Sequence, residues 1–182
     1  MGAVENLSLG PGTLYVAQVG STAPTTVTAA WAAAWKEIGY TAEGSEISIE
    51  LTNDPVDVAE EVDPVLHINS GRNTTVSFAM AEITARNLTI AMNGGTVTTS
   101  AGVTKYEPPA PSEAKRYALG WQSEDGTERW VFYRTFQSGG VSIARRKGAD
   151  KATIPVTMTV EKPSTGAPFT VLFKDSRSGG TV

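Results

Sequence analysis

Residues 46–52 read EISIELT, and this stretch decides the fold class. Apolar side chains at Ile47, Ile49 and Leu51 alternate with polar ones, which is the period of a half-buried β-strand. The same alternation continues through the VDV sequence at residues 56–58. We therefore expect a strand with its apolar face in the core and its polar face outward.

The period of two recurs along most of the chain. Further strands are expected within residues 13–19, 74–80, 117–121, 130–136, 154–160 and 169–173. The sequence EDG at residues 124–126 provides turn chemistry, so a β-hairpin is expected around it. Pro155 cannot donate a ladder hydrogen bond, so we expect its strand either to lie at a sheet edge or to begin there.

One segment has a clear helical period, residues 81–92, and the Asn-Gly-Gly sequence that follows ends it because glycine accepts a left-handed conformation. Its expected apolar face consists of Ala81, Ala85, Leu88 and Met92. A weaker helical pattern covers residues 29–38, where Trp31 and Trp35 lie four positions apart. The sequence thus predicts a mainly β fold, a sandwich or barrel-like domain with one flanking α-helix at about residues 81–93 and long loops.

A length of 182 residues with 40% hydrophobic content fits a single domain with its own core. Four segments are expected outside the regular structure: an N-terminal arm (about 1–12), an acidic loop or hairpin region (about 52–71), a proline-rich loop (about 94–114) and a short C-terminal tail (about 175–182). Neither a leader-like N-terminus nor an apolar run of ~18 residues is visible, so we expect no secretion signal and no membrane-spanning segment.

Acidic residues are concentrated in one part of the chain, between residues 37 and 71, where no lysine or arginine occurs. The nine are Glu37, Glu43, Glu46, Glu50, Asp54, Asp57, Glu60, Glu61 and Asp63. Of 19 acidic and 15 basic residues, ten acidic and all 15 basic ones lie elsewhere, which leaves +5 outside the segment. Because strand-like apolar residues run through it, we interpret the segment as an ordered negative surface rather than a disordered tail.

Composition and motifs give no enzyme signal and no cofactor site. The chain has no cysteine and a single histidine, His67, which excludes thiolate and multi-histidine metal sites. It has neither a phosphate-binding loop nor a G-x-S-x-G motif. His67 has a strand-like context without a partner set, so we interpret it as an ordinary strand residue. A net charge of −4 and a pI near 5.1 also disfavour a nucleic-acid binder, which is normally basic.

Two sets of carboxylates are candidates for chemistry. Glu46 and Glu50 lie four residues apart on one strand face, about 13 Å at ~3.3 Å per residue, whereas glycosidase pairs are separated by ~5–9.5 Å. Cross-strand carboxylate pairs stay open at this point. Asp54, Asp57 and Asp63 have the chemistry of calcium ligands but lack the D-x-[DN]-x-[DN]-G loop. We interpret both sets as surface charge.

Two stretches, WKEIGYTAEGSEI at residues 35–47 and GRNTTVSFAMAE at residues 71–82, resemble the tail tube proteins (major tail proteins) of long-tailed, siphovirus-type bacteriophages. The order of the expected elements is similar as well. The resemblance implies a β-sandwich flanked by one helix, six subunits in a ring, and rings stacked into a tube. Strands of neighbouring subunits would join into one inner β-barrel around an acidic lumen.

The resemblance also implies partners and a location. The chain would bind itself, the tape measure protein, the tail terminator and the distal tail or baseplate proteins, while DNA passes through the lumen without specific binding. It would be made in the host cytoplasm and reside in the phage tail of the virion. Genome ejection would then depend on an acidic wall that repels phosphate, because basic groups bind DNA through counterion release.

The resemblance assigns roles to three sets of residues. The expected lumen face consists of Glu46, Ser48, Glu50 and Thr52. The expected acidic loop, in the lumen or between rings, contains Asp54, Asp57, Glu60, Glu61 and Asp63. The bases expected at subunit interfaces are Arg72, Arg145, Arg146 and Lys147.

Two other classes of protein stay open. A different structural virion protein, such as a tail terminator or a head decoration protein, would share the β-rich sandwich and would also lack cysteine. A carbohydrate-binding or immunoglobulin-like module would use exposed aromatic side chains, for which Trp121, Trp130 and Tyr133 are the candidates. Alternating aromatics in a hairpin are more often core residues, and an enzyme is the least favoured class.

Overall fold

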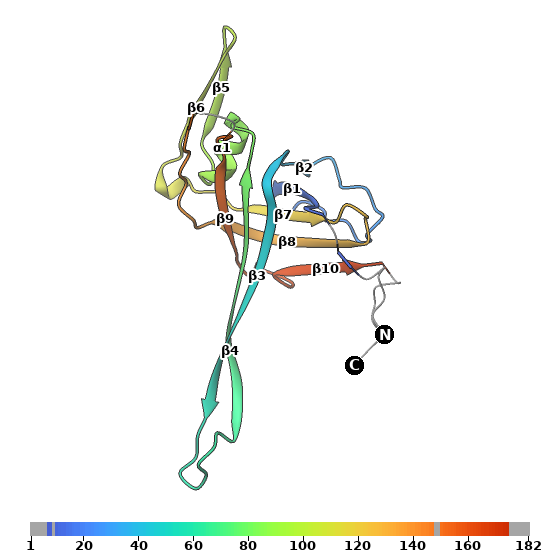
Figure 1. Cartoon of the computed structure of the whole chain (residues 1–182), viewed down its shortest axis with the longest axis vertical. Helices are drawn as coiled ribbons and strands as arrows, with labels where there is room; N and C mark the ends of the chain where they lie inside the picture. Colours follow the sequence, from blue (N-terminus) through green and yellow to red (C-terminus); the bar gives the residue numbers. More distant parts are fainter. Residues whose placement is uncertain (1–6, 9, 148–149, 175–182) are drawn as a thin grey trace.

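The computed structural model describes residues 7–8, 10–147 and 150–174 and has a mainly β architecture with one short α-helix (Figure 1). The strands are β1 (Thr13–Gln18), β2 (Lys36–Glu37), β3 (Thr41–Val56), β4 (Leu66–Met80), β5 (Thr96–Ser100), β6 (Val103–Glu107), β7 (Tyr117–Gln122), β8 (Glu128–Gln137), β9 (Ile154–Val160) and β10 (Phe169–Phe173). The helices are α1 (Ala85–Ala91) and the 3₁₀ turn η2 (Pro111–Glu113). The predicted fold class is confirmed. The expected C-terminal tail and most of the N-terminal arm lie outside the described residues.

Eight strands form one antiparallel sheet in the order β2-β1-β7-β8-β9-β4-β3, with β10 also paired to β8. Strand β8 pairs with β10 along its first half and with β9 along its last three residues. Because β8 changes partner, the sheet divides into two layers that cross, one with β1, β7, β8 and β10 and the other with β3, β4 and β9 (Figure 1). Strands that change sheet in this way are typical of crossed β packing.

The main core lies between these two layers. Met80 and Met158 come from the β4–β9 layer, and Leu119 and Phe132 from the β7–β8 layer, and all four have no exposed surface. These residues occupy the apolar positions of the alternating patterns, so the sequence period correctly identified the inward faces. A second cluster, Ala17, Trp35, Ala118 and Val131, lies on the opposite face of β1, β7 and β8.

The weak helical pattern at residues 29–38 was a wrong prediction, because this segment is a loop that leads into β2. Trp31 stacks on Tyr15 with ring centres 4.5 Å apart, and the Trp35 indole Nε1 donates to the Thr22 carbonyl at 2.8 Å. A Cβ at Gly120 would lie 2.3 Å from the Trp31 ring, so the close packing needs glycine. Tertiary packing of the tryptophans therefore overrides the local helical spacing.

Arg129 of β8 holds this loop through hydrogen bonds. Its side chain is almost fully buried, at 2% exposure. Its Nη1 donates to the carbonyls of Thr26 (2.8 Å) and Ala29 (2.9 Å). Its Nη2 donates to Gln122 Oε1 at 2.6 Å, and the guanidinium lies 4.7 Å from the centre of the Trp31 ring. Burial lowers the pKa of Arg129 below its usual value. The hydrogen bonds offset part of the cost of burying this charge.

Helix α1 is shorter than predicted, because Thr84 is its N-cap and accepts a hydrogen bond from the Asn87 backbone N–H at 3.1 Å. The helix ends as expected before the Asn-Gly-Gly sequence, but the first left-handed residue is Asn93, with φ of 54°, rather than a glycine. The Asn93 side chain donates to the Gln137 carbonyl at 2.8 Å and accepts from the Gln137 N–H at 2.9 Å. It thus continues the ladder of β8 where that strand ends.

Two further expectations are corrected in part. Strand β9 lies between β8 and β4, so it is not a sheet edge, but it does begin at Ile154, and Pro155 is its second residue. The stretch expected as a proline-rich loop, residues 94–114, contains the β5–β6 hairpin and η2. Its threonine-rich strands extend away from the body beside α1 (Figure 1).

Candidate functional site

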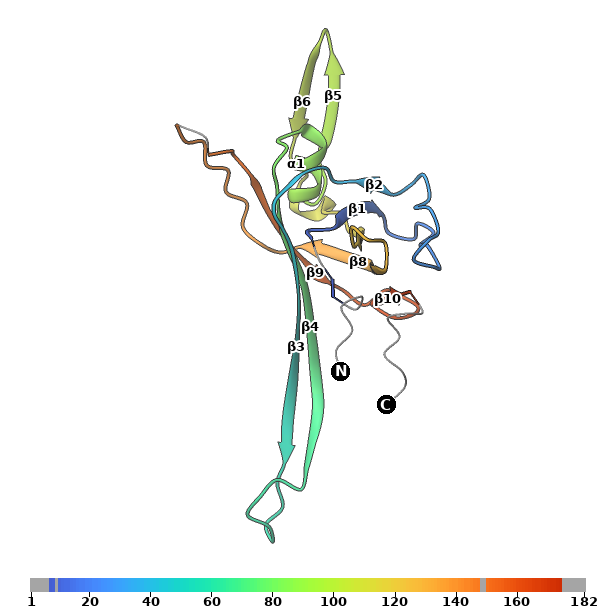
Figure 2. The ribbon, with the colours of Figure 1, turned by 45° about the vertical axis from the view of Figure 1, so that its right-hand side comes forward.

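The longest strands of the molecule, β3 with 16 residues and β4 with 15, form one antiparallel hairpin. Its upper half packs on the core, and its lower half projects far from the body (Figure 2). All residues from 49 to 70 are exposed except Val56, which is half-buried. A two-stranded ribbon without a packed face has little stability of its own, so this projection needs a covering surface.

The four residues predicted to form one face do so, because residues directly opposite each other in the hairpin point to the same side. The pairs are Glu46 with Ser77, Ser48 with Thr75, Glu50 with Asn73, and Thr52 with Gly71. Strand β9 continues the face through Thr157, opposite Ser77, and Thr159, opposite Thr75. We call these ten residues the polar face. It contains two carboxylates, several hydroxyls and no lysine or arginine.

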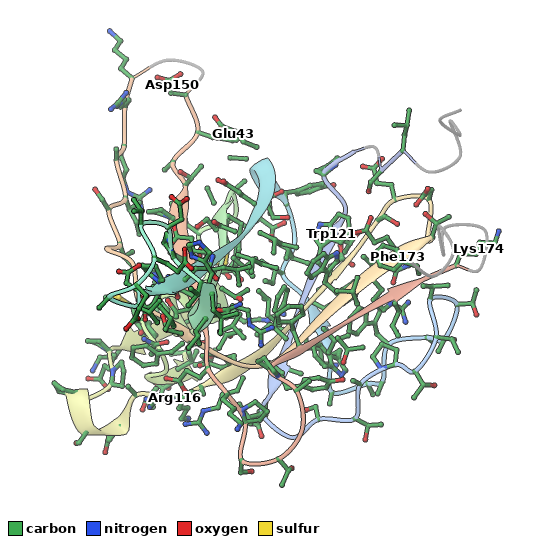
Figure 3. All side chains as sticks on the ribbon, turned by 90° about the horizontal axis from the view of Figure 1, so that it is seen from below. Glu43, Arg116, Trp121, Asp150, Phe173 and Lys174 are labelled. Atoms are coloured by element: carbon green, nitrogen blue, oxygen red, sulfur yellow. The ribbon has the colours of Figure 1, made fainter. Side chains whose placement is uncertain are left out.

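The polar face is hollowed. A depression of about 340 Å³ is lined by Glu46, Ser77 and Thr157. A larger one of about 630 Å³ adjoins it and is lined by Glu43 of β3 and Ala79 of β4. On the far side of β9 its lining consists of Ser142, Ala144, Arg146, Asp150, Lys151 and Thr153. Glu43 and Asp150, which both line the larger hollow, lie on the same side of the molecule (Figure 3). This layer is therefore concave toward its polar side.

The opposite side of the hairpin carries the apolar residues that were expected in the core. Ile47 does pack against the core, but Ile49 is 40% exposed and Leu51 is 55% exposed. The prediction was wrong for these two because the hairpin extends below β9 and the rest of the described chain does not cover it. Arg72, opposite Leu51, places its guanidinium 5.2 Å from the centre of the Phe169 ring.

The expected acidic loop is the tip of this hairpin. Asp54 still belongs to β3, and the other four predicted acids lie in the exposed connection between β3 and β4. They are Asp57, Glu60, Glu61 and Asp63. The loop begins later than predicted, because β3 runs to Val56. His67 is an exposed residue of β4 opposite Pro55.

The predicted bases lie in two separate places. Arg72 is on the hairpin, whereas Arg145, Arg146 and Lys147 lie in residues 138–147, which we call the basic arm. The arm follows β8, runs beside the start of β9 and then extends away from the body on the side opposite β10 (Figure 2). The sequence alone revealed the cluster of bases in the basic arm, but it did not show that Arg72 lies far from this cluster.

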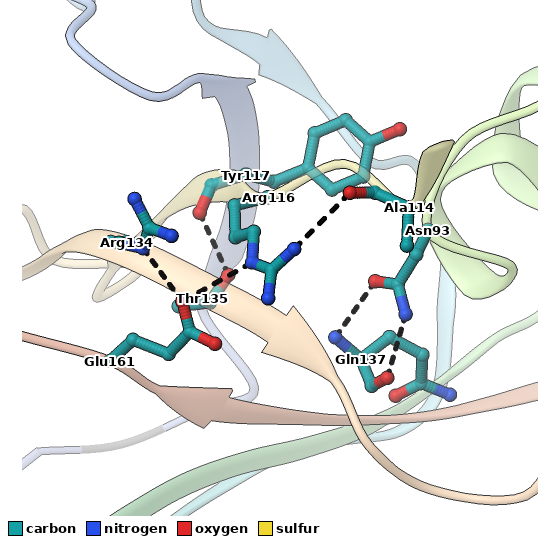
Figure 4. A network of polar contacts seen from close by, with 8 residues as sticks. All are labelled: Asn93, Ala114, Arg116, Tyr117, Arg134, Thr135, Gln137 and Glu161. Atoms are coloured by element: carbon teal, nitrogen blue, oxygen red, sulfur yellow. Dashed lines mark hydrogen bonds and ion pairs between the residues drawn. The ribbon is translucent and has the colours of Figure 1, made fainter. Parts of the chain in front are cut away.

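The sequence did not reveal an ionic network at the end of β9. Glu161 accepts hydrogen bonds from Arg134 Nε at 2.6 Å and from Arg116 Nε at 3.3 Å (Figure 4). The hydrogen bond from Arg134, and then the one from Arg116, hold the pKa of Glu161 below its usual value against the opposing effect of burial. The three residues come from different parts of the chain, so no local pattern could have found them.

The aromatic residues considered for glycan binding are packed. Trp121 is 9% exposed and its Nε1 donates to the Pro11 carbonyl at 3.0 Å. Trp130 stacks with Phe169, with ring centres 5.8 Å apart, and the Tyr133 hydroxyl pairs with Thr170 Oγ1 at 2.9 Å. Their main role is therefore packing, which agrees with the expectation that alternating aromatics in a hairpin are core residues.

Within the part of the chain that the structure describes, no three histidine, cysteine or acidic side chains are grouped to hold a metal ion. No helix among the described residues is long and apolar enough to cross a membrane.

Comparison with known proteins gives three results. A search of the curated proteins finds no significant match. Among solved structures, the chain is similar to the anti-feeding prophage cap (AFP tube terminating cap), at 9% identity and a TM-score of 0.39 over 88% of each chain. A family model described as phage tail tube protein matches residues 5–181. Since this match spans nearly the whole length, the chain belongs to the phage tail tube protein family.

Proposed function

We propose that the chain forms six-membered rings that stack into the tube of a siphovirus-type tail, with the polar face as the wall of the channel. Family membership makes the chain a structural, non-enzymatic component of the phage tail in the virion, and it implies self-assembly. We add to this the number of subunits in a ring, the type of tail and the face of the subunit that forms the channel wall.

The observation that carries the proposal is the composition of the polar face. Every second pair of β3 and β4, from Glu46–Ser77 to Thr52–Gly71, presents only acidic, hydroxyl, amide or glycine residues to one side of the hairpin. The first of these four pairs lines a hollow. Duplex DNA carries one charge per ~1.7 Å, and each basic contact would bind it. A wall with Glu46 and Glu50 repels phosphate within the ~8 Å Debye length, so DNA slides without being held.

The other predicted residues follow from the same arrangement. The acidic tip of the hairpin lies in the lumen or reaches the next ring, and the four bases contact acids of a neighbouring subunit. Tape measure protein fills the channel before DNA does, and terminator and distal tail or baseplate proteins contact the ends of the tube. Ring formation crowds the wall carboxylates, so burial of apolar surface such as Ile49 and Leu51 has to offset this repulsion, at roughly 25 cal/mol per Å².

Electron microscopy of the concentrated protein tests assembly. Tubes of uniform width with six-fold rings support the proposal. A monomer at every concentration contradicts it, and rings that never stack favour a terminator instead.

Charge reversal tests the wall. In tails assembled from the variant Glu46→Lys/Glu50→Lys, at a protein concentration raised until tubes form, we expect slower DNA delivery, because lysine binds phosphate. The matched control is Glu107→Lys/Glu113→Lys, which changes the net charge equally at two exposed positions outside the hairpin. Equal delivery by the two variants means that the polar face is not the channel wall.

A further inference from the structure

We infer that a ring closes by antiparallel pairing between the free edge of β3 in one copy and the basic arm of the next copy. The inference rests on the proposed function, because it names the two surfaces that join the subunits of one ring. It is carried by the free edges of one layer, by strand direction and by charge.

Strand β3 is one border of the main sheet. It is the last strand in the order and pairs only with β4, so among the described residues its other edge has no strand partner. Such an edge is a template for another strand. Its acidic residues Glu43, Glu46 and Glu50 repel a second copy of the same edge, which disfavours pairing of β3 with β3. A basic strand is therefore the suitable partner.

The basic arm is the opposite border of the same layer. The Ser138 N–H donates to the Thr157 carbonyl at 2.9 Å, so the arm begins in ladder contact with β9. Val141 and Ile143 pack against the core, whereas Ser142 lines the hollow of the polar face. This alternation is that of a strand, and it continues the layer in the order β3, β4, β9, arm.

Strand direction favours closure between these two borders. Strands β3 and β4 are antiparallel, β4 and β9 are antiparallel, and the arm runs back along β9. In a cyclic array the arm of one copy therefore runs opposite to β3 of its neighbour. The arm also extends away from its own hairpin (Figure 2), which is the direction in which a neighbour would lie.

The free edge of β3 and the basic arm carry opposite charges. Arg146 lines the same hollow as Ser142 and Ala144, so its side chain is on the side of the polar face. The ion pairs found among the described residues involve Lys105, Arg116 and Arg134, and none uses Arg146 or Glu46. Across the joint, Arg146 meets the carboxylates of the neighbouring β3, which reduces their mutual repulsion.

Charge exchange tests the pairing without assuming a register. In Arg145→Glu/Arg146→Glu, like charges meet at every joint, so we expect assembly to need at least about tenfold more protein. Adding Glu46→Arg/Glu50→Arg to the same chain should restore assembly toward the original concentration. The control Lys105→Glu reverses a base on β6 and should leave assembly unchanged. Failure of the combined variant to assemble better than the arm variant overturns the pairing.

Disulfide trapping provides a second measurement, since the chain has no cysteine. Ser142→Cys is combined in turn with cysteine at each of the four β3 positions of the polar face: Glu46, Ser48, Glu50 and Thr52. We expect at least one combination to give covalent oligomers up to the ring size after oxidation. The control Ser142→Cys/Thr99→Cys should stay monomeric under denaturing conditions.

The outcomes separate the two proposals. Tubes that form normally, with neither charge rescue nor cross-linking at any β3 position, overturn this joint and leave the tube intact. Failure of the unmodified chain to form rings or tubes overturns both.

Discussion

At the scale of the residue, Glu161 connects the two layers of the sheet. It follows β9, whereas its partners Arg134 and Arg116 belong to β8 and the segment before β7. Its side chain is 31% exposed, so solvent screens the pairing only in part. We expect Glu161→Gln to lower the free energy of unfolding by roughly 1 kcal/mol at neutral pH, as for other partly exposed ion pairs.

The loss should depend on pH in a defined direction. Because the pKa of Glu161 is lower in the folded state than the ordinary value of 4.5, its stabilising effect is complete above that value. It disappears as the pH falls through the folded-state pKa. Urea unfolding of both proteins between pH 7 and pH 3 should show the two curves converging at the acidic end. A constant difference across this range would mean that the charge of Glu161 is unimportant.

Sequence reasoning is weakest for such single residues. Arg129 looks like one more surface base beside Glu128, yet it is buried under Trp31 and bound to Gln122. Its partners are brought to it by the loop before β2, about a hundred positions earlier in the chain. No local period contains this information, because the contact exists only once the second cluster has packed.

At the scale of the element, Asn93 links the end of α1 to the end of β8. Its left-handed backbone suits asparagine, and its amide satisfies both the N–H and the carbonyl of Gln137. In Asn93→Asp the carboxylate can still accept but cannot donate, and it becomes a buried charge at a site that is 8% exposed. We expect a loss of roughly 2–4 kcal/mol in the free energy of unfolding.

Asn93→Gly serves as the comparison, because glycine keeps the left-handed backbone but removes both side-chain hydrogen bonds. It should cost less than the aspartate, about 1–3 kcal/mol, since no charge is buried. Chemical denaturation measures both. If aspartate and asparagine proteins are equally stable, the donated hydrogen bond to Gln137 contributes nothing.

The elements themselves were largely predictable, because their apolar residues follow a local period and face one core. The sequence pattern alone fails to predict burial where a strand extends beyond the strands that pack against it. Ile47 and Leu51 occupy equivalent positions in β3, but only Ile47 has β9 and the core beneath it. Alternation correctly predicted which residues of β3 form its polar side, but it wrongly predicted that Leu51 on the other side is buried. Alternation assigns residues to a face, whereas coverage of that face depends on strand length.

At the scale of the whole molecule, projecting segments extend from opposite ends of a small body, the β3–β4 hairpin below and the β5–β6 hairpin above (Figure 1). The lower hairpin exposes large apolar residues on its strands and tip: Ile49, Leu51, Val58, Val62, Val65, Leu66 and Ile68. Large apolar side chains exposed together on one projecting hairpin are typical of an interaction surface in a soluble protein. Self-assembly of the family accounts for a surface that a monomer leaves uncovered.

Hydrogen exchange can measure that covering directly. In the monomer, the amides of residues 49–56 and 66–73 belong to a two-stranded ribbon without a packed side, so they should open easily and exchange fast. The amides of β8 around Val131 and Phe132, which are essentially buried, should be protected in the monomer already.

On assembly, we expect protection of the ribbon to rise at least about tenfold, which corresponds to ~1.4 kcal/mol of added local stability. The amides of β8 are the internal control and should change little. Fast exchange that persists in assembled tubes would show that the hairpin lies outside the interfaces between copies. The apolar residues on it would then need a different partner.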